Sequence, residues 1–87
     1  MAGARSKPRR DYFRDKRYEL GKNIRLFREE REYSRDDLAE IMKVSRSTIS
    51  KIENGKFAMS IDYIMRFGWY LDFDMILVKN KKRSNSR

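Results

Sequence analysis

Four polar side chains between positions 46 and 51 combine positive charge with hydroxyl groups. They are Arg46, Ser47, Ser50 and Lys51, within the run VSRSTISKIENG at 44–55. Arginine, lysine and serine donate hydrogen bonds to phosphate oxygens and to base edges in the major groove of DNA. The run therefore predicts a face that binds nucleic acid. The competing interpretation, still open at this point, is an ordinary exposed helix surface.

The helix that would carry these side chains has a beginning, an inner face and an end. Ser45 suits the N-cap position, because its hydroxyl can accept from a free N–H group of the first turn. Ile49 and Ile52 are three residues apart and would face inward. Asn54 and Gly55 would end the helix, because glycine readily takes the left-handed conformation. We therefore expect a helix whose polar face is held by two isoleucines.

A second short helix is expected immediately before it, over 34–42. Ser34 and Asp37 have the spacing of a capping box, with aspartate in place of the usual glutamate or glutamine. Asp36 and Asp37 also suit the positive end of the helix. Its buried side would comprise Leu38, Ala39, Ile41 and Met42.

Two further helices are expected to flank this pair. Over 11–32, Leu20, Ile24 and Phe27 fall on one helical stripe, and Arg28 lies at the stripe's edge, where a cation needs a partner. Ser60 would cap a helix over 61–71. The apolar side of that helix would be Ile61, Ile64, Met65, Phe67 and Leu71. Trp69 and Tyr70 would either complete the core or face a second subunit.

The apolar pattern changes period over 72–79, DFDMILVK, which predicts a β-strand. An isolated strand leaves its backbone groups unpaired, and no second strand is evident. The simplest partner is the same strand of a second copy across a two-fold axis. The alternative is a frayed continuation of the last helix. The strand residues are Phe73, Met75 and Leu77 on one face, with Ile76 and Val78 on the other.

Composition limits the function classes. The 87 residues suit one domain, and they include no Cys and no His. Disulfides, Cys-ligated zinc, a thiol nucleophile and the usual general base are therefore excluded. We expect no enzyme activity, no cofactor and no metal. No signal peptide or bilayer-spanning run is apparent, so a cytoplasmic protein without a membrane role is expected.

The net charge of +9 resides in the two ends of the chain. Residues 1–10 carry four basic residues and residues 79–87 carry five, so that the body between them is neutral. We expect 1–10 and 80–87 to be disordered basic segments on either side of a domain over 11–71 and a strand over 72–79. Basic segments suggest a polyanionic partner, with plain solubility as the alternative.

The two runs SRDDLA at 34–39 and VSRSTISKIENG at 44–55 occur together, and with the rest of 20–71 the chain resembles the lambda repressor and Cro-like (Xre) helix-turn-helix family. The final LDFDMILVK is similar to HipB-type antitoxins, in which such a strand pairs with its twin in a dimer. The resemblance implies a compact all-α bundle of about four to five helices. A short C-terminal β-strand would pair across a dimer.

The resemblance also assigns roles to individual residues. Those expected to contact DNA bases are Arg46, Ser47, Ser50 and Lys51, and those expected to contact phosphates are Arg35, Asn54 and Lys56. Arg28 and Glu53 match a buried ion pair of the family.

Three departures from the family's pattern carry expectations of their own. Arg35 replaces a common glutamine that braces the DNA-reading helix that begins after Ser45, which leaves the bracing open. Glu32 and Lys43 replace helix-ending glycines. Arg46 also replaces a common glutamine, which favours guanine over adenine in each half-site.

These observations predict a sequence-specific DNA-binding regulator of prokaryotic or phage origin that associates with the nucleoid. It would act as a homodimeric repressor on an inverted-repeat operator in double-stranded DNA. One alternative is an antitoxin that neutralises a toxin protein and regulates its own gene. Another is a protein-binding adaptor built on the same fold.

Overall fold

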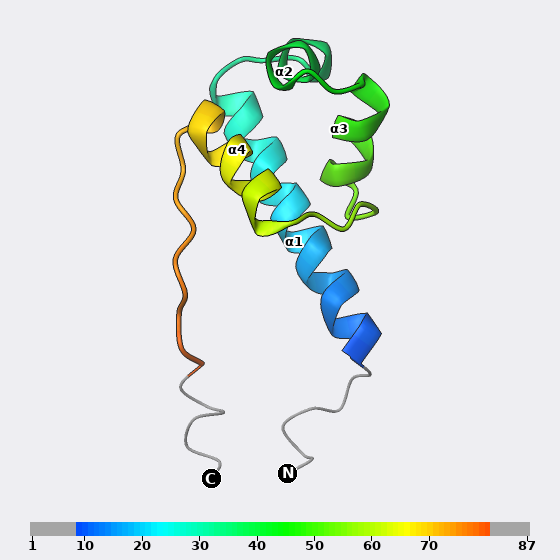
Figure 1. The fold of residues 1–87 in the computed structure, drawn as a ribbon, viewed down its shortest axis with the longest axis vertical. Helices are drawn as coiled ribbons and strands as arrows, with labels where there is room; N and C mark the ends of the chain where they lie inside the picture. Colours follow the sequence, from blue (N-terminus) through cyan, green and yellow to red (C-terminus); the bar gives the residue numbers. More distant parts are fainter. Residues whose placement is uncertain (1–8, 81–87) are drawn as a thin grey trace, which may run out of the picture.

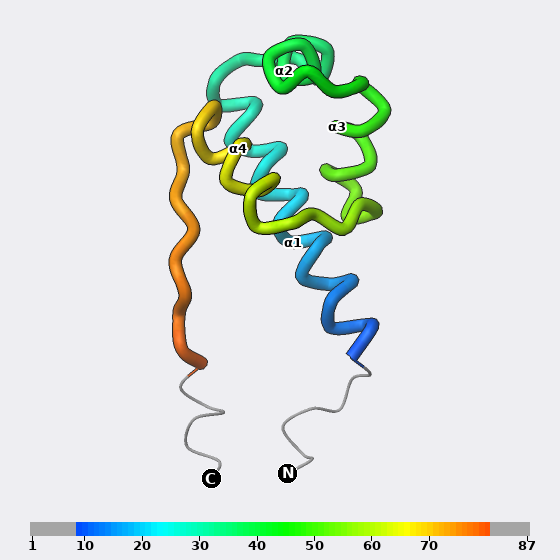
Figure 2. Tube along the Cα trace, viewed as in Figure 1, coloured from blue at the N-terminus to red at the C-terminus, as the bar shows by residue number. Residues whose placement is uncertain are grey.

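The computed structural model describes residues 9–80 as four α-helices followed by an extended segment. The helices are α1 (Arg9–Glu30), α2 (Arg35–Met42), α3 (Arg46–Glu53) and α4 (Ile61–Leu71). In Figures 1 and 2, α1 is the long helix, α2 lies across its C-terminal end, and α3 and α4 pack along its C-terminal half. The compact all-helical fold is thus confirmed for the described residues.

The core lies where the four helices meet. Ile24 of α1 and Phe67 of α4 are fully buried, together with Ile49 of α3. The predicted inner face of α3 is confirmed, because Ile52 is also buried, and that of α2 is confirmed for Leu38, Ala39 and Met42, whereas Ile41 is only half-buried. These residues form one apolar cluster, and α3 therefore has a fixed inner face and a fixed outer face.

Helix α1 begins earlier than expected. Arg9 and Arg10, which were assigned to a disordered basic segment, form its first residues. Local charge pairing favours this start, because the Arg14 side chain lies 3.4 Å from Asp11 and 3.6 Å from Asp15. The rest of the expected basic segments, 1–8 and 81–87, lies outside the described residues.

The ends of the short helices follow the sequence closely. Ser34, Ser45 and Ser60 each accept a hydrogen bond from the backbone N–H three residues on, as N-caps do. The capping box between Ser34 and Asp37 is complete in both directions.

Two residues that replace glycine adopt the left-handed conformation. Glu32 and Lys43 have φ values of 60° each, so the glycine-like turns after α1 and α2 are kept by non-glycine residues. Such a conformation costs a residue with a Cβ atom roughly 1–2 kcal/mol. The short connections around α2 are therefore locally strained.

Helix α4 buries a narrower face than predicted. Ile64, Phe67, Gly68 and Leu71 are buried, with the spacing of one helical stripe. Ile61 and Met65 were expected in the core but are 60% and 56% exposed, because they lie outside this stripe. Trp69 is 83% exposed, so the expectation that it completes the core is wrong.

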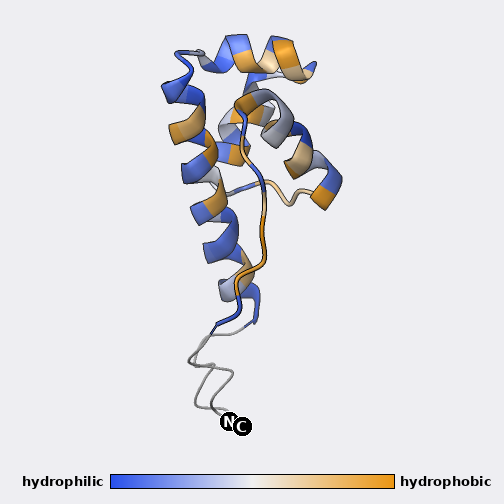
Figure 3. Ribbon diagram, turned by 90° about the vertical axis from the view of Figure 1, so that its left-hand side faces the viewer, coloured by the Kyte–Doolittle hydropathy of each residue, from blue (hydrophilic) through white to orange (hydrophobic). Residues whose placement is uncertain are grey.

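Residues 73–80 extend back along the molecule after α4, and no strand is assigned to them within the described range. The turn is tight because the Phe73 N–H donates to Gly68 O at 3.0 Å and because Gly68 has no Cβ to meet Phe73 O. Figure 3 shows this segment as a mainly apolar stretch. The four apolar residues of the predicted strand after Phe73 are exposed: Met75, Ile76, Leu77 and Val78. Pairing with a second copy stays a prediction.

Candidate nucleic-acid interface

The outer face of α3 is set by the burial of its inner face. Ile49 and Ile52 are 0% and 1% exposed, which turns Arg46, Ser47 and Lys51 toward solvent. At the start of the helix, the Ser45 hydroxyl accepts from Thr48 N–H at 3.0 Å. A rigid helix thus presents short hydroxyl side chains between long basic ones.

The residues predicted to bind DNA are brought together on the surface. One open depression of about 410 Å³ lies over α3 and the loop that follows it. Its lining consists of the predicted base-contacting and phosphate-contacting residues and no others: Arg35, Arg46, Ser47, Ser50, Lys51, Asn54 and Lys56. Four of these side chains are cationic and none is acidic, so the depression attracts anions. Their contact with DNA stays a prediction.

The end of α3 is held by its own polar groups. Asn54 donates from its side-chain Nδ2 to Ser50 O at 2.9 Å, and Gly55 follows with φ at 73°. A Cβ at Gly55 would lie 2.8 Å from the Cα of Tyr18, so this position accepts only glycine without a shift of α1. The side-chain amide of Asn54 has a second N–H, which could donate a hydrogen bond to a phosphate oxygen.

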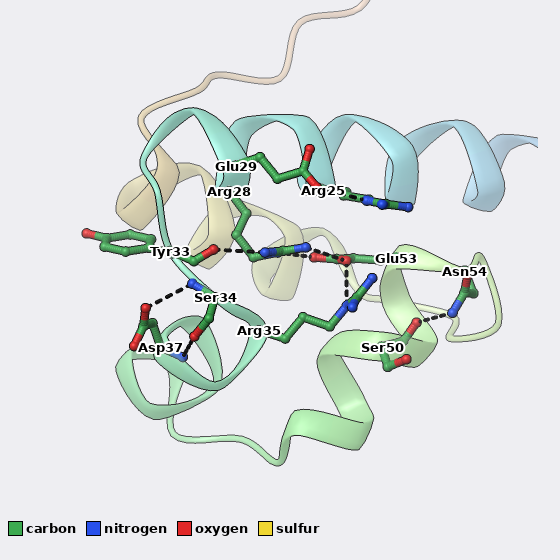
Figure 4. A network of polar contacts seen from close by, with 10 residues as sticks. All are labelled: Arg25, Arg28, Glu29, Tyr33, Ser34, Arg35, Asp37, Ser50, Glu53 and Asn54. Carbon is green, nitrogen blue, oxygen red and sulfur yellow. Dashed lines mark hydrogen bonds and ion pairs between the residues drawn. The ribbon is translucent and has the colours of Figure 1, made fainter.

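A buried ion pair ties α1 to the end of α3, as the family resemblance implied (Figure 4). Arg28 donates to Glu53 from Nε at 2.6 Å and from Nη2 at 3.1 Å, a bidentate arrangement. Its Nη1 donates to Tyr33 O at 2.8 Å. The pair therefore links α1, the connection to α2, and α3.

Arg35 adds a second guanidinium to this carboxylate. Its Nε donates to Glu53 Oε1 at 3.0 Å, and its side chain is 31% exposed. Arg35 therefore braces α3 in place of a glutamine, because it connects the first turn of α2 to the last turn of α3. Nε is the atom that donates to Glu53, and the same residue also lines the depression.

A second ion pair between α2 and α3 was not anticipated from the sequence. Arg46 Nε lies 3.3 Å from Asp36 Oδ1, and the two side chains are 64% and 76% exposed. Asp36 had been interpreted only as a favourable charge at the start of α2. An exposed pair of this kind contributes about 0–1 kcal/mol, which leaves Arg46 able to change partners.

Two other contacts that hold the helices together were also not predicted from the sequence. A Cβ on Gly21 of α1 would lie 2.3 Å from Ile52 O and 2.8 Å from Glu53 O, so glycine allows α1 and α3 to touch through their backbones. Arg66 of α4 donates to Met42 O at 2.6 Å and satisfies the end of α2. A glycine inside a helical pattern was the available signal for the first contact.

Neither a metal-binding cluster nor a membrane-spanning helix is found within residues 9–80. No group of His, Cys, Asp or Glu in that range could hold a metal ion. None of the helices described there has the length and apolar character needed to cross a membrane.

The fold and the depression can be compared with known proteins. A protein-family model described as helix-turn-helix matches residues 24–67, about half of the chain, from the second half of α1 into α4. The matched range contains α2, α3 and every residue of the depression. No curated protein and no solved structure gave a match.

Proposed function

The chain belongs to the helix-turn-helix family of DNA-binding regulators, and from this premise we propose that it is a dimeric repressor of an inverted-repeat operator. In this proposal α3 enters the major groove. Arg46, Ser47, Ser50 and Lys51 contact base edges there. Arg35, Asn54 and Lys56 contact phosphates and set the position of α3.

The depression is the observation that carries the proposal. It gathers four cationic side chains and two serines over one short helix, with no carboxylate in its lining. A helix with its side chains is about 10–12 Å across and the major groove is about 12 Å wide, so α3 fits the groove. Each cation at a phosphate also releases counterions, which adds affinity for any duplex.

Arg46 carries the expected base preference. A guanidinium group pairs with O6 and N7 of guanine through two parallel hydrogen bonds, worth about 1–3 kcal/mol against the wrong base. We therefore propose a guanine in each half-site opposite Arg46. A selected operator without any constant guanine would contradict this assignment.

The dimer is proposed to form through residues 73–78. Leu77 is 99% exposed and its neighbours Ile76 and Val78 are 79% and 80% exposed, an unusual state for an apolar run in water. Antiparallel pairing with the same segment of a second copy would satisfy the backbone and cover these side chains. Each subunit would then read one half-site, with the half-sites about one helical turn apart.

Repression in this proposal is by occlusion of the operator. Within residues 9–80 the family match covers the helix-turn-helix pair, and the proposal places the DNA-binding surface on that pair. The family is one of DNA-binding proteins, and the proposal assigns no catalysis. The place of action would be the nucleoid in the cytoplasm of a bacterium.

The test is selection of bound duplexes from a random DNA pool. Wild type is compared with the double substitution Arg46→Ala and Lys51→Ala. A control, Lys16→Ala with Lys22→Ala, removes the same charge from exposed positions on α1, away from the depression. We expect wild type and the control to enrich an inverted repeat and the α3 variant to lose it. Equal loss in both variants, or no motif with wild type, would contradict the proposal.

An antitoxin is the second candidate, and exposed apolar side chains favour it. Ile61, Met65 and Trp69 recur at intervals of four residues along the outer side of α4, with exposures of 60%, 56% and 83%. A toxin could cover these side chains while the same dimer represses its own gene. Co-purification with the product of an adjacent gene, lost on Trp69→Ala, would support this candidate. If no DNA motif is enriched at all, the adaptor function becomes the better explanation.

A further inference from the structure

The ion pair between Asp36 and Arg46 joins a residue of α2 to the residue of α3 that is expected to read a base. Asp36 is not part of the depression's lining, whereas Arg46 is. The carboxylate therefore contacts Arg46 without lining the depression itself. This is an unusual place for an acidic side chain, because a carboxylate close to DNA repels phosphates.

The geometry of the pair suggests why it is there. The nitrogen of Arg46 nearest the Asp36 carboxylate is Nε, at 3.3 Å. Because Nε is the nitrogen that faces the carboxylate, the two terminal nitrogens of Arg46 are left for another partner. Those two nitrogens are the pair that can approach O6 and N7 of guanine end-on.

We propose that Asp36 is a specificity-determining residue that orients Arg46 for guanine. It acts through Arg46 and makes no base contact itself, so it is a positioning residue. The proposal rests on the proposed function, since it requires α3 to read DNA. It goes further by assigning the discrimination between bases to a pair of residues on two different helices.

The proposal has two consequences of opposite sign. Loss of the Asp36 charge removes repulsion from phosphates, so binding to arbitrary DNA should strengthen. Loss of its hold on Arg46 frees the guanidinium to adopt other orientations, so the preference for guanine should weaken. A carboxylate that merely competed with DNA for Arg46 would have the reverse effect on preference, because its removal would release Arg46 for the base.

Glu40 provides a matched control for the charge. It lies one turn beyond Asp36 on the same helix, is exposed, and makes no ion pair with Arg46. Glu40→Gln removes the same charge as Asp36→Asn. It should alter binding to every duplex by one common factor and leave the base preference unchanged.

The experiment measures binding of fluorescent duplexes to the full chain. The probes are the inverted repeat enriched by wild type and the same duplex with the Arg46-dependent guanine of one half-site replaced by each other base. The ratio of the two affinities is the guanine preference. For Asp36→Asn we expect that ratio to fall about two- to fivefold, the range of one exposed ion pair. Binding to an unrelated duplex should tighten.

The double variant tests whether the effect of Asp36 depends on Arg46. In an Arg46→Ala background, Asp36→Asn should no longer change the base preference, because its effect passes through Arg46. The thermal midpoint of unfolding of each variant is measured together with its base preference, because Asp36 also lies in the first turn of α2. If Asp36→Asn also lowers the base preference in the Arg46→Ala background, the effect belongs to α2 itself and the proposal is overturned.

Failure of this inference differs from failure of the proposed function. If wild type prefers guanine and Asp36→Asn keeps or increases that preference, the orienting role of Asp36 is wrong and the regulator remains. If wild type enriches no sequence at all, the proposed function fails, and the role of Asp36 fails with it.

Discussion

Glu53→Gln should be among the most destabilising single substitutions in this fold. The Glu53 side chain is 1% exposed and accepts three hydrogen bonds, two from Arg28 and one from Arg35. Glutamine removes the charge and turns a donor toward a guanidinium group. The Arg28 side chain, 7% exposed, would then keep Tyr33 O as its acceptor and no counter-charge.

The magnitude follows from the burial of this cluster. A buried charge that loses its partner costs about 3–5 kcal/mol, against a total of about 5–15 kcal/mol for a typical domain. For a domain of this size each kcal/mol lowers the thermal midpoint by about 4–8 °C. We therefore expect the midpoint to fall by at least about 12 °C.

The two partners of Glu53 make the effect asymmetric. Arg28→Met removes the deeper guanidinium but leaves the carboxylate paired with Arg35. Its cost should be smaller, about 2–3 kcal/mol, because the remaining charge is still compensated. Replacing both members, Arg28→Met with Glu53→Leu, should cost less than Glu53→Gln alone, because no buried charge is then stranded.

The assay is unfolding followed by circular dichroism at 222 nm, at one fixed protein concentration so that any dimer contributes equally. Glu29→Gln is the matched control, since it breaks an exposed pair in which Arg25 Nε lies 3.1 Å from Glu29 Oε2. That control should cost about 0.3–0.5 kcal/mol. If Glu53→Gln were as mild as Glu29→Gln, the cluster would not be holding α1 and α3 together.

Three further substitutions test other parts of the structure. Gly21→Ala should destabilise the fold by about 1–3 kcal/mol despite alanine's better helix propensity, because its Cβ would meet Ile52 O at 2.3 Å. Thermal unfolding measures this change, and an unchanged midpoint would argue against the close contact. Lys43→Gly should raise the midpoint by relieving a φ of 60°, a gain of about 1 kcal/mol in the same assay. Leu77→Lys should keep the midpoint of the monomer and abolish dimers in sedimentation equilibrium; a wild type that is monomeric at high micromolar concentration would remove the dimer altogether.

Much of the candidate site could be predicted because its signals are local. The caps at Ser34, Ser45 and Ser60 depend on a hydroxyl and an N–H group three residues apart. The spacing of Ile49 and Ile52 by itself defines which side of α3 is exposed. The seven lining residues of the depression follow from that face and from the family resemblance.

The interpretation of α4 and of the last segment was less successful. Apolar residues were assigned to the core by type, but a small four-helix body has room for one stripe of α4 only. Met65 and Trp69 therefore remain at the surface. Residues 75–78 are exposed in the single chain, and within residues 9–80 no second strand pairs with them, so the predicted strand is not confirmed.

The sequence alone determined the four helices, the starts of α2, α3 and α4, and the polar face of α3, because these depend on neighbouring residues. The family resemblance implied that Arg28 and Glu53 meet, and tertiary structure decided the other pairings of distant charges. Glu53 is 25 residues from Arg28 and 18 from Arg35, and their contact depends on how α1 and α2 cross α3. The pairing of Arg46 with Asp36 depends on the same crossing. Helix crossing is set by core packing and by the absence of a side chain at Gly21, and no local pattern records it.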